Sequence, residues 1–488
     1  MSTASGAQTN SQPHGLVRAM GLWDVVLFNV AAVLGPRWVA TAAHTGPSSI
    51  GVWVTAAILF FVPEALVITE LATRYPQVGG LYAWTHEAFG PFHGFVSGWV
   101  YWTYSIVYFP ALLNASVAMS VYMGGPKVAV LATNKLFVIV GSLVILGIAI
   151  WINIVGVHIG KWLENAGAAG TYLPLLLLVI FGAWFAVHFG SVTQFTARSM
   201  NVHFSWGTVN YWAQIAFAFA GLEVVCFMSE EVRNPQKTLK HGIFISAIAI
   251  VAIYVLGTMG TLAILHPGQV DLRAGAIQAL TSAAGQFGLA WVAIIMATLL
   301  FIGNIGGVGT TVAGVARVPF AAGIDRYLPR AFGKIHPTWR TPWVAMLVQG
   351  GAAAVLLIVS QIGGASAASA YQLLVDATDI MYFIAFLYTF LAVIALRHRP
   401  DRGKEAGHAL IPLGQFGLWV CGVLGVLITL LSIIISLIPP NDLQGSRVWF
   451  EVKLIGICAV LILSGLVLYW RKNKRGGTLG AAGAAAMR

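Results

Sequence analysis

Long apolar segments, each of about 20 residues or more, cover most of this chain and restrict what it can fold into. A helix of that length spans a bilayer and satisfies its own backbone hydrogen bonds there. Of the 488 residues, 58% are hydrophobic and 9% are charged, whereas soluble domains carry roughly 25% charged residues. The sequence therefore predicts an all-α membrane protein with 12 transmembrane helices. They are expected at residues 22–45, 50–73, 93–123, 134–155, 162–188, 206–229, 242–265, 284–316, 341–361, 370–396, 412–438 and 447–470.

Lysine and arginine are divided unevenly between the two sets of loops in this topology. With the N-terminus in the cytoplasm, 20 of the 27 fall on inner loops and tails, 6 on the outer side, and Arg37 within a span. This bias follows the positive-inside rule, so we expect a multi-pass protein of the cell membrane with both termini cytoplasmic. The net charge of +11 then reflects contact with anionic lipid rather than nucleic-acid binding.

The ends of the chain and its linkers complete the expected organisation. The polar N-terminus lacks the basic start and short apolar core of a cleavable signal. The three cysteines have unrelated spacings, and we predict no cofactor and no metal site apart from the sodium alternative given below. The expected parts are a disordered cytoplasmic tail (1–15), a ten-helix core (16–400) with repeats at about 16–190 and 204–400, helices 11 and 12 (401–471), and a cytoplasmic tail (472–488).

Two of the apolar segments carry features that interrupt a helix. The first contains Gly35 and Pro36 followed by Arg37, and the sixth contains Gly221 followed by Glu223. Irregular backbone at this depth survives only where protein or an enclosed wet cavity surrounds it. If the first ten spans form two sets of five, helices 1 and 6 correspond and run in opposite directions, as in transporters with inverted repeats. A simple proline kink is the alternative for the first segment.

Residues 69–99 read TELATRYPQVGGLYAWTHEAFGPFHGFVSGW. This stretch resembles the signature of the amino acid, polyamine and organocation superfamily, from Glu-Leu-Ala through Pro-x-x-Gly-Gly-x-Tyr-x-Trp to Gly-Phe-x-x-Gly-Trp. Residues 217–223 with 230–243, and residues 303–345, resemble the sixth and eighth helices of the same family with their following loops. The resemblance implies a five-plus-five inverted repeat with broken helices 1 and 6, and transport of amino acids or related amines by alternating access.

The first break departs from the pattern of many members, which have Gly-Ser-Gly-Ile/Val-Phe there. Here Pro36 removes a backbone donor, and Arg37 supplies five side-chain donors suited to a carboxylate. Together with residues 153–174, this Arg looks more like the glutamate/GABA-antiporter branch than the polyamine or cationic branches. The lysine in helix 5 that some members use for proton coupling has no counterpart here.

Arg37 is the residue on which the site hypothesis depends, because a buried arginine needs a partner. It either binds the substrate carboxylate or pairs permanently with Glu223 or Glu64; snorkelling toward the outer face is a third alternative. The breaks are expected to offer backbone groups to a zwitterion, and one face of helix 3 is implied to line the pocket. The predicted substrate-binding residues are Leu34, Gly35, Arg37, Tyr101, Tyr104, Ser105, Phe217, Ala218, Phe219, Ala220, Gly221 and Asn304.

Gating and coupling residues are predicted with a structural alternative for each. Glu223 either links gating to protonation or braces the unwound backbone. Phe217 is either a lid over the substrate or a core aromatic. Glu231 and Arg317 are candidates for an inner gate, or else belong to a solvated loop face. Thr310 and Thr311 are a weaker candidate sodium site, the alternative being hydroxyls bonded within their own helix.

Asp376 and Asp379 lie on adjacent turns of the tenth segment. They either face the outer vestibule and attract substrate amines, or are hydrated near the interface; we favour hydration.

Other classes of function find little support in the chain. HEAFG at residues 86–90 begins like a zinc-protease motif, but Gly90 stands where the second histidine is required. A channel would need a continuous polar stripe, and a transporter-like nutrient sensor would be expected to carry a large cytoplasmic extension. We therefore expect a non-enzymatic secondary transporter that exchanges amino acids. Proton- or sodium-coupled symport is the alternative; the substrate and the oligomeric state are left open.

Overall fold

The computed structural model of the chain is helical throughout the part that it describes, apart from one isolated backbone bridge between Met20 and Val232. The predicted all-α membrane fold is therefore confirmed, and the expected tail at 1–15 lies outside the described residues. The structure describes residues 20–75, 80–155, 157–202, 209–225, 232–315, 327–339, 341–362, 366–397 and 411–485.

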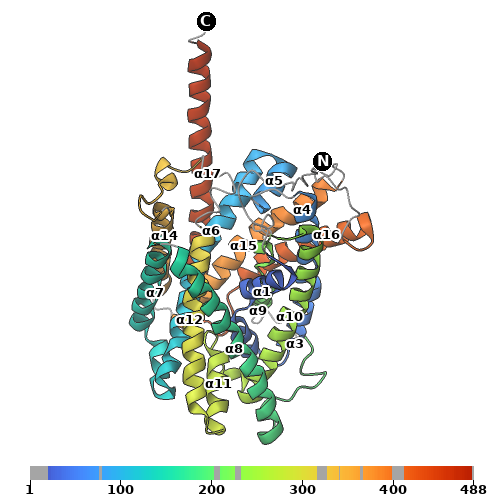
Figure 1. The fold of residues 1–488 in the computed structure, drawn as a ribbon, viewed down its shortest axis with the longest axis vertical. Coiled ribbons are helices and arrows are strands. Elements are labelled where there is room, and N and C mark those ends of the chain that lie inside the picture. Colours follow the sequence, from blue (N-terminus) through green and yellow to red (C-terminus); the bar gives the residue numbers. More distant parts are fainter. Residues whose placement is uncertain are drawn as a thin grey trace, which may run out of the picture.

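Helices follow one another along the chain and pack into one elongated bundle (Figure 1). Within the described residues, 10 helices are long and apolar enough to cross a membrane, and one bent pair makes an eleventh. The sixth predicted segment contains only a shorter apolar helix, so the count of 12 stays a prediction. The helices are α1 (Leu22–Val33), α2 (Pro36–His44), α3 (Ser49–Ala56), η1 (Ala57–Phe61), α4 (Val62–Arg74), α5 (Leu81–Phe89), α6 (Pro91–Ser120), η2 (Val121–Gly124), η3 (Pro126–Thr133), α7 (Lys135–Val155), α8 (Val157–Phe189), α9 (Val209–Phe217), α10 (Pro235–Ile264), η5 (Pro267–Gln269), α11 (Gly275–Gln286), α12 (Ala290–Val315), η7 (Arg330–Gly333), α14 (Trp343–Gln361), α15 (Ala367–Leu396), α16 (Gly414–Ser436) and α17 (Arg447–Ala485).

The first span is broken where the sequence predicts it. α1 ends at Val33, α2 begins at Pro36, and the two helices are bent by 49° relative to each other. Leu34 and Gly35 between them have extended backbone, and Pro36 occupies the first position of α2, where its missing N–H costs no hydrogen bond. The bend exceeds an ordinary kink, because two residues leave the helical conformation altogether.

The sixth segment is interrupted over a longer stretch. α9 ends at Phe217, and residues 218–225 form turns and a short 3-10 segment. Gly221 has φ +123°, a conformation that side-chain-bearing residues rarely adopt. A Cβ atom at Gly221 would lie 3.1 Å from the carbonyl oxygen of Ala32 in α1. The second break therefore lies close against the end of α1, next to the first break.

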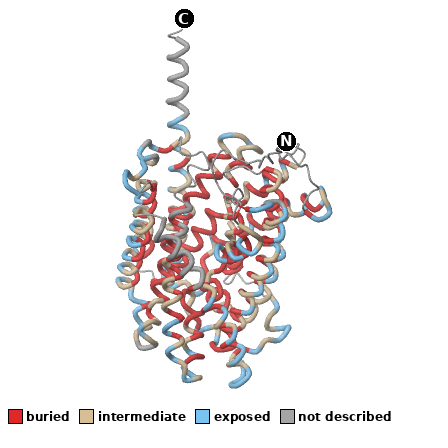
Figure 2. The backbone as a smooth tube through the Cα atoms, in the orientation of Figure 1, coloured by how far each residue is buried: buried red, intermediate tan, exposed pale blue. Residues whose placement is uncertain are grey.

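α6 and α15 form the centre of the bundle. In their most apolar windows, 83% of the residues of the α6 span and 67% of those of α15 are buried. Figure 2 shows buried residues concentrated along the middle of the bundle and exposed residues around its outside. The outer surface is nevertheless apolar: α7 exposes Leu136, Val140, Val144, Ile148 and Trp151. A soluble protein would not leave such a stripe in water, whereas lipid covers it at no cost.

Candidate functional site

Arg37 lies in the first turn of α2, directly after the first break. It is only 3% exposed, and its guanidinium carbon lies 4.4 Å from the centre of the Trp38 ring and 4.9 Å from that of Tyr108 on α6. These cation–π contacts stabilise the charge but do not supply a hydrogen-bond acceptor to every N–H group. Arg37 Nε has no hydrogen-bond partner, and no ion pair joins Arg37 to a carboxylate in the described chain. The alternative of a permanent pair with Glu223 or Glu64 is therefore not observed.

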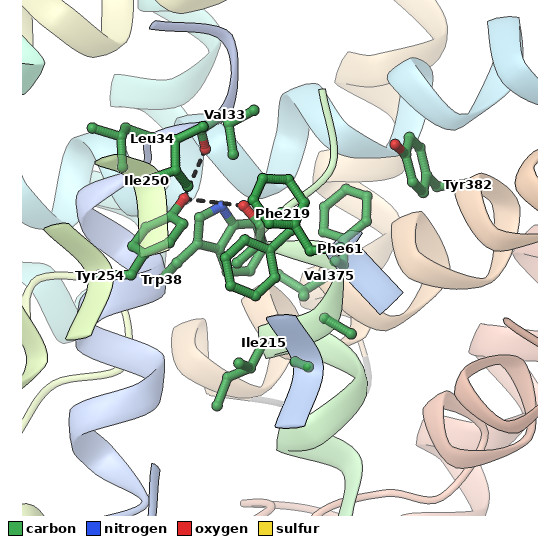
Figure 3. Packing of buried hydrophobic residues seen from close by; sticks show 14 of the residues in the cluster. Val33, Leu34, Trp38, Phe61, Ile215, Phe219, Ile250, Tyr254, Val375 and Tyr382 are labelled. Carbon is green, nitrogen blue, oxygen red and sulfur yellow. Dashed lines mark hydrogen bonds between the residues drawn. The ribbon is translucent and has the colours of Figure 1, made fainter. Parts of the chain in front are cut away.

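Tyr254 of α10 connects the two breaks. Its hydroxyl oxygen lies 2.7 Å from the carbonyl oxygen of Val33 and 3.0 Å from that of Ala218, and it accepts the Gly35 N–H at 3.1 Å. Figure 3 shows this hydroxyl between the two irregular segments. A break frees backbone groups that lipid cannot satisfy, and Tyr254 meets those of both breaks at once. Sequence reasoning did not identify Tyr254.

Aromatic rings pack around this connection. Trp53 stacks on Tyr254 with 4.4 Å between ring centres, and Phe61 stacks on Phe219 at the same 4.4 Å. Phe219 is fully buried in this cluster, so its side chain supports the second break while its backbone belongs to the predicted cradle. The structure thus brings Leu34 and Gly35 next to the segment that carries the other predicted cradle residues. Those residues are Ala218, Phe219, Ala220 and Gly221.

Glu223, just after the second break, is held by several donors. Tyr101 of α6 donates its hydroxyl to Oε1 at 3.0 Å, and the Gly221 N–H donates to Oε2, also at 3.0 Å. The Tyr382 hydroxyl on α15 lies 3.2 Å from Glu223 Oε2 and 3.2 Å from Oε1 of Glu64 on α4. Both glutamates are buried, and Glu64 Oε2 has no partner. Glu223 therefore braces the break and also shares one tyrosine hydroxyl with a second buried carboxyl group.

Phe217, the last residue of α9, lies between two other aromatic residues. Its ring centre is 5.5 Å from that of Trp38 and 5.1 Å from that of Tyr382, both in edge-on geometry. Trp38 follows Arg37, and Tyr382 contacts Glu223. Phe217 therefore separates the cationic side of the site from the Glu223 side. This position is compatible with both predicted roles of Phe217, a lid over the substrate and a core aromatic.

The three residues predicted to share one face of helix 3, Tyr101, Tyr104 and Ser105, do not all contact the same part of the protein. The Tyr104 ring lies 5.2 Å from Tyr101 and 5.6 Å from Tyr382, so Tyr101 and Tyr104 both belong to the Glu223 cluster. Ser105 instead accepts a hydrogen bond from Gln349 of α14 at 2.9 Å. Asn304 of α12 contacts the Met119 sulfur at 3.5 Å. Neither contact of these last two residues reaches Arg37 or Glu223.

Asp376 and Asp379 correct one expectation. We favoured hydration near the interface, but both residues are fully buried in the middle of α15. Asp376 accepts hydrogen bonds from Gln214 at 2.8 Å and Asn210 at 3.2 Å. Neither carboxylate oxygen of Asp379 has a hydrogen-bond partner among the described residues. Spacing along one helix could not show the burial, because α9 supplies the covering side chains.

Some predicted residues lie outside the described part of the structure. Glu231 and Arg317 lie outside the described residues, and the side chains of Thr310 and Thr311 are not described, although both residues belong to α12. The predicted gate and sodium site there stay predictions.

Asp442, in the loop between α16 and α17, joins the far ends of both broken helices. His44 Nε2 at the end of α2 lies 2.8 Å from Oδ2, and the Tyr211 hydroxyl of α9 lies 2.9 and 2.7 Å from the two carboxylate oxygens. Burial raises the pKa of the Asp442 carboxyl, but the hydrogen bonds from His44 and Tyr211 outweigh it and leave the pKa below its usual value. His44 Nδ1 also lies 2.9 Å from the Val270 carbonyl oxygen.

Arg37, Glu223 and Asp379 are all buried in this structure. A small cleft with room for about one water molecule lies at the ends of α14, α15 and α17, with Ser369 and Lys453 in its wall. This cleft is not lined by Arg37, Glu223 or Asp379. A solute that reaches the buried Arg37 therefore requires side chains or helices to move apart.

Comparison with known proteins gives a match along almost the whole chain. Residues 20–475 match the family model described as amino acid permease. An uncharacterised transporter of Legionella pneumophila is 27% identical, over 90% of this chain and 94% of its own length. The serine/threonine exchanger SteT of Bacillus subtilis is 26% identical, over 96% of this chain and 99% of its own length. A glutamate/gamma-aminobutyrate antiporter of Lactococcus lactis is 22% identical, over 86% and 84%.

These matches agree with the resemblance drawn from residues 69–99. The family match also covers both breaks and the last two helices. The matched relatives are membrane transport proteins, and two of the three are named for the exchange of amino acids or their derivatives.

Proposed function

Because this chain belongs to the amino acid permease family, we propose that it is a secondary transporter that exchanges amino acids across the cell membrane by alternating access. Two relatives that cover most of the chain are named as exchangers, which supports exchange over one-way transport. The two broken helices in contact supply the irregular backbone that such transporters place at the substrate site. The charge distribution supports cytoplasmic termini.

The observation that carries the proposal is the buried guanidinium at the first break. Arg37 is buried, flanked by two rings and without a carboxylate partner among the described residues. A buried charge without an ionic partner is costly, and a bound carboxylate offsets that cost through two parallel hydrogen bonds. We therefore propose that Arg37 binds the carboxylate group of the substrate.

The contacts of Tyr254 suggest which parts move together. Its hydroxyl holds both breaks to α10, so α1, α2, α9 and α10 are connected through one side chain. In the proposed cycle these helices, with α3 and α4, rock as a unit against α6, α7, α12 and α14. Contacts within the moving unit persist, whereas the contact of Tyr101 with Glu223 crosses between the units and changes. The contact of Tyr382 joins Glu223 to α15, outside both units.

The test uses purified protein in lipid vesicles. Labelled amino acids are screened with and without unlabelled amino acid inside, and with imposed sodium or pH gradients. We expect flux that requires internal amino acid, and a loss of about 100-fold or more for Arg37→Ala, because a buried ion pair with the substrate is lost. Arg37→Lys should restore part of the flux. Normal exchange by Arg37→Ala would overturn the assignment.

One observation favours proton-coupled symport as a second candidate. Glu64 and Glu223 are both buried and both contact the Tyr382 hydroxyl, which has a single proton to donate. Two carboxylates this close in a dry site favour holding a proton between them. Uptake driven by a pH gradient into vesicles without internal amino acid, and lost in Glu64→Gln, would favour this candidate over exchange.

A further inference from the structure

α15 carries two buried carboxylates with very different surroundings. Asp376 accepts hydrogen bonds from the side-chain amides of Gln214 and Asn210. Asp379, one turn later, is equally buried, yet both of its oxygens lack a hydrogen-bond partner in the part of the chain that the structure describes. Leaving a buried carboxylate without donors is among the most costly arrangements in a protein interior. The donors of Gln214 and Asn210 therefore compensate the burial of Asp376, whereas no described donor compensates the burial of Asp379.

Packed aromatic residues connect Arg37 with the part of α15 that carries Asp379. Trp38, which lies against the Arg37 guanidinium, packs edge-on against Phe217, and Phe217 packs against Tyr382 and Phe383, about one turn after Asp379. No ion pair joins Arg37 and Asp379 among the described residues. Both residues thus border one aromatic cluster, and each keeps at least one polar atom without a partner in the described part of the chain. A guanidinium and a carboxylate that border one cluster without pairing suit a ligand carrying both charges.

The backbone carbonyls of the breaks are the other acceptors expected for a substrate amine. The Tyr254 hydroxyl already approaches two of them, those of Val33 and Ala218. Glu223 likewise receives the Gly221 N–H and two tyrosine hydroxyls. Among the acidic groups around the breaks, Asp379 is the carboxylate with both oxygens unpartnered.

We propose that Asp379 binds the ammonium group of the substrate whose carboxylate is bound by Arg37, so that one solute bridges α2 and α15. This inference rests on the proposed function and extends it to the substrate class. One positive and one negative anchor match a zwitterionic amino acid with an uncharged side chain. An amine without a carboxylate, or an acid without an amine, leaves one buried charge unmet and binds more weakly.

The experiment measures competition by compounds that each lack one charge. L-Serine is compared with ethanolamine, which lacks the carboxylate, and with 3-hydroxypropionate, which lacks the amine. Each competes with labelled L-serine exchange in vesicles, and each is also added to purified protein to measure the rise in Tm. Wild type should prefer L-serine to either analogue by at least about tenfold, since each missing contact is a charge-assisted hydrogen bond.

The variants separate the two anchors. Asp379→Asn should reduce the preference for L-serine over 3-hydroxypropionate to within about twofold, while preference over ethanolamine remains. Arg37→Ala should reduce the preference for L-serine over ethanolamine to within about twofold, while the preference over 3-hydroxypropionate remains. Asp379→Glu, which keeps the charge, should restore part of the first preference. Glu451→Gln removes one acidic charge at the start of α17 and should change neither ratio.

Several results would overturn the proposal. An unchanged ratio in Asp379→Asn would show a structural carboxylate, and a loss of pH dependence with unchanged ratios would show a proton site. If Asp379→Asn does not give monodisperse protein, the wild type still decides, because equal competition by 3-hydroxypropionate contradicts an ammonium anchor. Serine binding with these ratios but without exchange overturns the proposed function alone. Absence of any amino acid binding or exchange overturns both.

Discussion

The two breaks interrupt predicted membrane spans with different residues and different charges. The first takes two extended residues, Leu34 and Gly35, and places a cation after them. The second includes at least the eight described residues 218–225, contains a backbone conformation that L residues rarely adopt, and places an anion within it. The cation after the first break has aromatic neighbours and an Nε without a partner in the described part of the chain, whereas Glu223 accepts hydrogen bonds on both of its oxygens. We therefore expect the charge at the first break to serve a ligand and the charge at the second to stabilise the break itself.

The largest expected difference in stability between the two breaks comes from replacing Glu223 or Arg37 by alanine. Glu223→Ala leaves two tyrosine hydroxyls and the Gly221 N–H without an acceptor, so we expect a loss of about 3–5 kcal/mol in the free energy of unfolding. Arg37→Ala should keep the wild-type Tm, because it breaks no ion pair with a described carboxylate. Thermal unfolding in detergent measures both. A larger loss in Tm for Arg37→Ala than for Glu223→Ala would contradict this comparison of the two breaks.

Adding a methyl group at each break should give the next largest difference. Gly221→Ala introduces a side chain at φ +123°, 3.1 Å from a backbone oxygen, and should cost about 1–3 kcal/mol. Gly35→Ala should cost less, because its φ of −137° suits any residue and its added atom meets only the Trp38 side chain. Equal losses in Tm for the two variants would show that the backbone conformation at Gly221 is not the cause.

Removing the hydroxyl that joins the breaks should have a moderate effect. Tyr254→Phe keeps the stacked ring but leaves the Gly35 N–H and two carbonyls unsatisfied, so we expect a loss of about 1–3 kcal/mol and slower exchange. Tyr469→Phe is the matched control, because no hydrogen bond of its hydroxyl is described. If both variants behave as wild type, the breaks do not depend on this connection.

The smallest effect concerns pH at the far ends of the broken helices. The pKa of Asp442 is lower in the folded protein than its ordinary value of 3.8. Its contribution to stability is therefore fully present above about pH 4 and is lost as pH falls through the folded pKa. Asp442 is 40% exposed, so we expect less than about 1 kcal/mol. The difference in Tm between wild type and Asp442→Asn should shrink between pH 6 and pH 3; a constant difference would contradict this.

The sequence predicts the spans and the first break well, because both follow from local chemistry. A run of apolar residues needs a helix in lipid, and Gly35 with Pro36 cannot continue one. The second break is harder to delimit. Gly221 signals it, but the length of the irregular segment depends on contacts with Ala32 and α10, which no local pattern encodes.

The charged groups of the site were identified from the sequence, but their partners were not. Tyr254 lies 219 residues from Gly35, and Tyr382 lies 318 residues from Glu64. Tyrosines are common in membrane helices, so nothing in either local sequence marks these two. The burial of Asp379 was missed for the same reason: the covering helices are distant in the chain. The roles predicted for the site residues stay predictions.

Asp442 gives the last two helices a part to play beyond the repeats. Its carboxylate contacts both His44 and Tyr211, so α2 and α9 are held to the same loop between α16 and α17. A movement of α2 relative to α9 therefore has to break one of these contacts or carry the loop with it. If the proposed cycle includes that movement, a binder that fixes this loop should slow exchange without touching the substrate site.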